Sequence, residues 1–292
     1  MEYSVFDAHC DTLYIAADTD KSLYENDVMA DFRRMSAYNS YTQILACWIE
    51  PKYASSALER SMELIDTYYE NPCSYKNVRT ILSIEGGEMI SSTAVLRNLY
   101  RLGVRIAGLT WNYSNHIASG ADEKDPERGL TEFGKTVVRE MERIGMYIDV
   151  SHLNDRSFYD IEQITDMPLI ATHSNSRSIC GHRRNLTDDM FERIIKSGGC
   201  AGINFYPMFL NDKGRAGIDD IVRHIERFMS LGGENCIGIG ADFDGVDYLP
   251  EGINGCEDVY KVFDRLLQLN YSEEAVEKIS HRNFENLFYG GK

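Results

Sequence analysis

The stretch YSVFDAHCDTLY (residues 3–14) joins an apolar run to a histidine and a carboxylate. Side chains alternate along a β-strand, so residues two apart point to the same side. If the strand continues through this stretch, His9 and Asp11 share a side and could hold one metal ion together. An isolated His-x-Asp pair is more often a hydrogen-bonded histidine beside a solvated aspartate. The rest of the chain therefore decides between the two interpretations.

Seven further short apolar runs follow this first one. They are YTQILACWI (41–49), VRTILSIEG (78–86), VRIAGLTW (104–111), MYIDVSH (146–152), PLIATHS (168–174), CAGINFY (200–206) and CIGIGADF (236–243). Most are near-continuous rather than alternating, which is typical of parallel strands covered on both faces.

Helical patterns lie between the runs. Apolar residues follow a helical spacing in four places: Leu58, Met62 and Ile65; Val95, Leu99 and Leu102; Val137, Val138, Met141 and Ile144; Ile218, Ile221, Val222, Ile225, Phe228 and Met229. Thr187 and Ser272 precede acidic residues and are expected helix N-caps, whereas Gly145 is expected to end a helix.

Eight strands that alternate with helices in 292 residues predict an α/β fold, a (β/α)8 TIM-type barrel formed by residues 1–292 as a single domain. An open doubly wound sheet is the competing fold, but no G-x-G-x-x-G follows the first strand. The strand-to-helix links are long, at 112–130, 174–187, 207–216 and 243–256. In a barrel such loops build the active-site face.

The composition narrows the function classes. The net charge of −16 disfavours binding to nucleic acid and to anionic membrane surfaces. Seven cysteines without a C-x-x-C pair fit a reduced, intracellular protein. We expect a cytoplasmic protein without a membrane anchor, since no signal peptide and no apolar run of membrane-spanning length is evident.

Titratable residues end five of the predicted strands. They are His9 with Asp11, Glu85, His152, His173, and Asp242 with Asp244 close behind. Each has an ordinary explanation: a histidine of the core, a helix cap at Glu85, or a turn at Asp242. The carboxyl ends of barrel strands converge, however, so together they predict a metal site.

The residue types suit two divalent ions, with zinc as the first expectation and manganese or cobalt also compatible. Glu85, from a middle strand, could bridge the two ions. His9 and Asp11 would hold one ion, and His152 and His173 the other. A hydroxide that bridges the metals would then be the nucleophile, with Asp242 accepting and delivering protons.

With these motifs the chain resembles the membrane (renal) dipeptidase family of zinc peptidases, among the amidohydrolase-like, metallo-dependent hydrolase barrels. The resemblance runs through FDAHCDTLY, SIEGGEMI, LRNLYRLGVR, LTWNYSN, DVSH, THSNSR, HRRNLTDD, INFYP and GADFDGV. It implies the same two ligand sets, with Glu85 shared, and Asp242 as the catalytic carboxylate. It also implies that Arg184 binds the terminal carboxylate of the substrate, which suits a guanidinium fork.

The resemblance also implies substrate contacts for Asn112 and Tyr206. Trp111 stands where the renal enzyme has a histidine that helps to bind substrate. Trp111 is therefore a candidate for substrate binding, but its indole N–H can donate one hydrogen bond and cannot become charged. A homodimer and tolerance of C-terminal D-residues are further family-based expectations.

The resulting hypothesis is a zinc-dependent metallopeptidase, a binuclear dipeptidase that hydrolyses dipeptides. The alternative is a metal-dependent amidohydrolase that acts on another amide or a lactam. A third hypothesis, a non-catalytic metal-binding descendant of such an enzyme, is disfavoured because all five predicted ligands are present.

Overall fold

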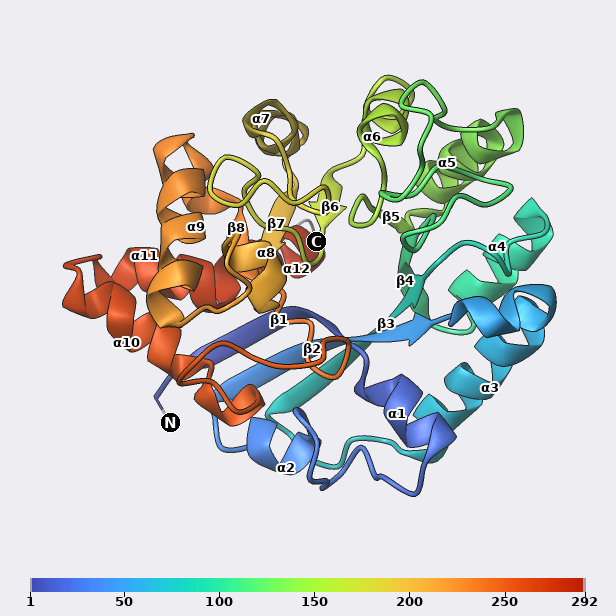
Figure 1. The fold of residues 1–292 in the computed structure, drawn as a ribbon. Helices are drawn as coiled ribbons and strands as arrows, with labels where there is room; N and C mark the ends of the chain where they lie inside the picture. The colour runs from blue at the N-terminus through green and yellow to red at the C-terminus, as the bar shows by residue number, and fades with distance from the viewer. Residues whose placement is uncertain (1, 291–292) are drawn as a thin grey trace.

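The computed structural model describes residues 2–290 and forms a closed barrel of eight parallel strands in chain order, which confirms the predicted (β/α)8 fold (Figure 1). The strands are β1 (Ser4–Cys10), β2 (Ser40–Trp48), β3 (Val78–Glu85), β4 (Val104–Gly108), β5 (Tyr147–Asp149), β6 (Leu169–Ala171), β7 (Cys200–Ile203) and β8 (Ile237–Ile239). β8 closes the barrel against β1, where Ile239 pairs with Asp7.

Helices surround the strands in a ring (Figure 1). The α-helices are α1 (Thr12–Asp18), α2 (Phe32–Met35), α3 (Ala57–Glu70), α4 (Thr93–Arg101), α5 (Glu132–Ile144), α6 (Asp155–Glu162), α7 (Asp188–Ser197), α8 (Pro207–Leu210), α9 (Ile218–Ser230), α10 (Tyr260–Gln268), α11 (Glu273–Glu277) and α12 (Asn283–Tyr289). Short helical turns are η1 (Pro51–Ser56), η2 (Gly233–Asn235), η3 (Cys256–Asp258) and η4 (Lys278–Arg282). Within residues 2–290, no helix combines the length and apolarity that crossing a bilayer requires.

Local signals in the sequence set several helix ends. The Thr187 hydroxyl accepts the backbone N–H of Met190, and the Ser272 hydroxyl accepts that of Ala275, so both predicted N-caps are confirmed. Gly145 ends α5 with φ 73°, a conformation that favours glycine.

The helix faces agree with the sequence where the apolar pattern is strong. α9 buries Ile221, Val222, Ile225 and Phe228, as its spacing predicts. The prediction for α3 is wrong at Leu58, which is 40% exposed. The buried face of α3 instead contains Leu64 and Ile65. Ile65 fits both helical registers, so spacing alone cannot select the one that buries Leu64.

A small cluster of apolar side chains fills one end of the barrel interior. Phe6 and Ala8 of β1 join residues of several other strands there, and Phe284 of α12 stacks on Phe6 with ring centroids 5.2 Å apart. α12 lies near the centre of the ring in Figure 1. None of the buried strand residues in this cluster is the last of its strand, so the carboxyl ends of the strands are left to form a site.

Candidate active site

His9 and Asp11 meet at the end of β1, although not for the reason that the sequence suggested. Phe6 and Ala8 face the barrel interior, and the pairing of β1 with β2 becomes irregular after Asp7. Asp11 lies beyond the strand, with φ −105° and ψ 13°. The prediction of simple strand alternation is therefore wrong. An irregular strand end and a turn bring His9 Nε2 to 3.4 Å from Asp11 Oδ2.

Glu85, the last residue of β3, lies at the centre of the predicted ligands. Its Oε2 is 3.5 Å from His9 Nε2, and its Oε1 is 2.8 Å from His152 Nε2 and 3.6 Å from His173 Nε2. The ordinary explanation of Glu85 as a helix cap fails, because Ser92 caps α4. Glu85 thus faces both pairs of residues that the sequence assigned to separate ions.

The outer ring nitrogens of His152 and His173 are held by neighbouring side chains. His152 Nδ1 is 2.8 Å from Asn112 Oδ1. His173 Nδ1 is 2.8 Å from Thr172 Oγ1, and that hydroxyl donates to Asp149 Oδ2 at 2.5 Å. A hydroxyl that donates to a carboxylate accepts from the imidazole, so His173 carries its proton on Nδ1. The side-chain oxygen of Asn112 can only accept a hydrogen bond, so His152 also carries its proton on Nδ1.

Both histidines consequently direct a lone pair inward. Their Nε2 atoms are 2.8 Å apart, and both face Glu85 Oε1. Two lone pairs and a carboxylate at such short range repel one another unless a cation lies between them. Histidine ligands held by an outer hydrogen bond are usual in metal sites, so these residues fit a bound ion.

The ionisation of the site favours neutral imidazoles on this side. Burial lowers the pKa of His152 to about 3, with the positive charge of Arg184 adding to the effect. Burial likewise lowers the pKa of His173. Burial also disfavours charge on His9, but Glu85 and Asp11 outweigh it and raise the pKa of His9. Burial and the charge of Glu85 raise the pKa of Asp11 to about 7.

Geometry also supports an ion beside His9 and Asp11. Neither ring nitrogen of His9 has a hydrogen-bond partner among the described residues, nor does the buried Oδ1 of Asp11. Ligand atoms of His9, Asp11 and Glu85 lie within 4.8 Å of one another, as do those of Glu85, His152 and His173. Buried, unpartnered polar atoms are costly, and two ions sharing Glu85 would satisfy them.

Asp242 approaches the same site from the loop after β8. Asn204 donates its side-chain N–H to Asp242 Oδ2 at 2.8 Å, while Oδ1 is 3.8 Å from His9 Nε2. Burial raises the pKa of Asp242, although His9 opposes the shift. Asp242 and His152 both adopt left-handed backbone conformations, with φ of 64° and 68°. Such conformations in non-glycine residues are uncommon and concentrate at functional sites.

Arg184 lies beside the site with an unsatisfied guanidinium group. The residue is 5% exposed, and its buried Nε and Nη2 have no hydrogen-bond partner among residues 2–290. Its Cζ lies 5.6 Å from the centroid of the Phe209 ring. Burial lowers the pKa of Arg184 to about 10, although Asp242 and Glu85 oppose the shift. The group is therefore a buried cation in need of an anion.

A cavity of about 230 Å³ opens over Asp11, Glu85, His152 and Asp242. The predicted substrate contacts Trp111, Asn112 and Tyr206 line it, whereas Arg184 is not among its lining residues. Trp111 and Asn112 come from the loop after β4, and Tyr206 precedes α8. Trp48 also lines the cavity, with its ring centroid 5.5 Å from that of Trp111. The wall at this side is mainly aromatic.

Several site residues were not singled out from the sequence. Asp149 and Thr172 support His173, and Asn204 holds Asp242. The sequence signal that could have identified Asp149 and Thr172 is a polar residue at the end of an apolar run, as in DVSH and ATHS. Asp244, considered as a fourth carboxylate, instead accepts from the Thr12 hydroxyl at 2.5 Å.

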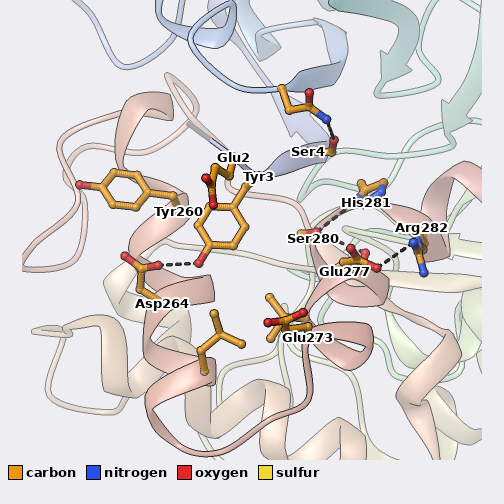
Figure 2. Close-up of a pocket in the computed structure, with 13 residues that line it drawn as sticks. Glu2, Tyr3, Ser4, Tyr260, Asp264, Glu273, Glu277, Ser280, His281 and Arg282 are labelled. Atoms are coloured by element: carbon orange, nitrogen blue, oxygen red, sulfur yellow. Dashed lines mark hydrogen bonds and ion pairs between the residues drawn. The ribbon is translucent and has the colours of Figure 1, made fainter.

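A larger cavity, of about 660 Å³, lies away from this site, at the beginning of β1 (Figure 2). Several of its polar groups pair with one another. Tyr3 donates to Asp264 at 2.5 Å, and Arg282 pairs with Glu277 at 2.7 Å. None of the predicted site residues lines it.

Comparisons with known proteins identify the family of the chain. The family model for membrane dipeptidases, peptidase family M19, matches residues 1–288. An uncharacterised dipeptidase of Schizosaccharomyces pombe is 32% identical over 302 residues, which cover 89% of this chain and 72% of the relative.

Solved structures show the same fold. Dipeptidase AC, a metallopeptidase of family M19, is 25% identical with a TM-score of 0.89, and the match covers 98% of each chain. A metallopeptidase from Rhodobacter sphaeroides, liganded with a phosphinate mimic of L-Ala-D-Ala, is 24% identical with a TM-score of 0.86, over 98% of this chain and 99% of that one. The chain belongs to the membrane dipeptidase family of metallopeptidases, peptidase family M19.

Proposed function

We propose that the chain is a dipeptidase that works with two divalent metal ions, most simply zinc. His9, Asp11 and Glu85 would hold one ion, and Glu85, His152 and His173 the other. The proposal rests on the two ligand sets that share Glu85 and on the inward lone pairs of the two histidines. When bound, the ions supply Lewis-acid polarisation of the scissile carbonyl and a nucleophilic water near neutral pH.

The observation that carries the substrate class is the buried, unpaired guanidinium of Arg184. A guanidinium binds a carboxylate through two parallel hydrogen bonds, which would satisfy the unpartnered Nε and Nη2. A free carboxylate close to the scissile bond is a property of dipeptides. Arg184 is buried, so the additional residues of a longer peptide would have no space beside it.

Asp242 is proposed to move the proton. Asn204 occupies Oδ2 as a donor and leaves Oδ1 toward His9 and the cavity. Burial raises the pKa of Asp242, and a carboxyl group with a raised pKa can accept a proton from the attacking water and pass it to the leaving amine. Asn112 orients His152, while Trp111 and Tyr206 contact the substrate.

The test is hydrolysis of a panel of L,L- and L,D-dipeptides by protein supplied with zinc, manganese or cobalt. The same samples receive dipeptide amides, N-acyl amino acids and lactams. Turnover that requires a metal and a free terminal carboxylate supports the proposal. Turnover of carboxylate-free amides alone would replace it with the alternative, a metal-dependent amidohydrolase of another amide or lactam. Acceptance of C-terminal D-residues, the homodimer and the cytoplasmic location stay predictions.

A further inference from the structure

A second cavity, of about 210 Å³, adjoins the proposed active site. Segments after β2, β3 and β4 form it, including Ile49, Glu88, Tyr113 and Asn115. Trp111 lines both this cavity and the one over the predicted metal ligands. Trp111 is therefore the wall residue that the two cavities share.

Glu88 gives this cavity an unsatisfied negative group. Its Oε1 accepts from Asn115 Nδ2 at 3.3 Å, but its buried Oε2 has no hydrogen-bond partner. Across residues 2–290, no Lys, Arg or His nitrogen lies within 4.0 Å of the Glu88 carboxylate. Burial raises the pKa of Glu88 above its usual range. A cation that enters the cavity would relieve this carboxylate.

The other walls also suit a cation. The rings of Trp111 and Tyr113 meet edge to face with centroids 5.5 Å apart. Aromatic faces attract ammonium and guanidinium groups, and indole does so most strongly. Glu50, the other carboxylate of the cavity, is already paired with Lys52 and the Tyr14 hydroxyl. Glu88 is thus the free anionic group among these lining residues.

The position of the cavity relates it to one end of a dipeptide. Arg184 stands on the loop after β6, whereas Glu88 stands on the loop after β3, with the predicted metal ligands between them. With its carboxylate at Arg184 and its scissile bond at Glu85 and Asp242, a dipeptide would direct its N-terminal residue toward β2, β3 and β4. Building on the proposed dipeptidase function, we propose that the cavity receives the cationic side chain of an N-terminal lysine or arginine, bound by Glu88.

The test compares substrates that differ only in the side-chain charge. Lysyl-alanine and norleucyl-alanine have the same backbone charges and closely similar side-chain length. We expect kcat/KM of the wild type to favour lysyl-alanine by roughly ten-fold or more, since a hydrogen bond to a buried charged group typically has this effect. Glu88→Gln should reduce this ratio toward one. Glu132→Gln, an exposed carboxylate paired with Lys135, should leave the ratio at the wild-type value.

Three outcomes would overturn the proposal. A wild-type ratio near one would do so without any variant, and would leave the dipeptidase function intact because both substrates are cleaved. An equal loss for both substrates in Glu88→Gln would mean that Glu88 acts on the backbone ammonium group or on the fold. A lack of turnover for every dipeptide would instead remove the dipeptidase function itself.

Discussion

Replacing Arg184 by methionine should stabilise the protein and impair catalysis at the same time. Burial lowers the pKa of Arg184 from its ordinary value to about 10, which corresponds to about 3 kcal/mol of disfavoured charge in the folded state. At pH 7 the group is protonated in both the folded and the unfolded chain, so the whole penalty is present. It is relieved only as pH rises above about 10.

Methionine keeps much of the side-chain volume and removes the charge. We expect the free energy of unfolding of metal-free Arg184→Met to rise by up to about 3 kcal/mol at pH 7. The kcat/KM for dipeptides should fall roughly a hundred-fold, because a buried charged hydrogen-bond pair with the substrate carboxylate is lost. Dipeptide amides, which lack that carboxylate, should lose much less.

Urea unfolding and steady-state hydrolysis on the same preparations check both halves of this prediction. Arg183→Met is the matched control, since Arg183 is its chain neighbour but is exposed and paired with Asp122 at 3.2 Å. It should change neither property appreciably. A destabilisation of Arg184→Met, or unchanged dipeptide hydrolysis, would refute the reading of Arg184 as an unsatisfied carboxylate receptor.

Three further predictions concern the predicted metal ligands and their supports. Thr172→Val removes the hydroxyl that holds His173 Nδ1, so zinc binding should weaken about 10–100-fold. Calorimetry measures the zinc affinity, and an unchanged affinity would contradict the role of Thr172. Gly245→Ala should lower both metal content and turnover, because a Cβ there would lie 2.2 Å from Asp11 Oδ2 and 2.5 Å from Asp242 Oδ1; normal loading would contradict the geometry. Between pH 7 and pH 5, metal-free wild type should lose about 2 kcal/mol more unfolding free energy than His152→Asn. The reason is that a folded-state pKa of about 3 in place of 6.5 makes stability fall as the pH drops below 6.5. Equal pH slopes in denaturant titrations would exclude this.

The fold could be predicted because its signals are local and repeated. Eight apolar runs, caps such as Thr187 and the helix end at Gly145 all act within a few residues. The register of α3 could not be predicted, since Leu58 and Leu64 both fit a helical spacing with Ile65 and only packing distinguishes them.

The candidate site could be predicted where its titratable residues lie at the ends of apolar strands. Glu85, His152 and His173 could be grouped because the carboxyl ends of barrel strands converge. The positions of Asp11 and of the Asp149–Thr172 pair depend on an irregular strand end and on contacts between strands. Such contacts join residues far apart in the chain, so no spacing within the sequence encodes them.

The carboxylate of Glu88, with its one buried oxygen, illustrates the same limit. In the sequence it follows two glycines and looks like part of a turn. Only the structure shows that its Oε2 is buried without a partner beside the aromatic side chains that follow β4.

The most direct test of the central claim is the metal content of wild type and Glu85→Ala after zinc is supplied, measured together with dipeptide hydrolysis on the same samples. Glu132→Ala serves as the surface control. If Glu85 is shared by two ions, wild type and control should hold about two ions per chain and hydrolyse dipeptides. Glu85→Ala should lose both properties. A Glu85→Ala protein that keeps two ions and full turnover, or a wild type that binds none, would contradict the account.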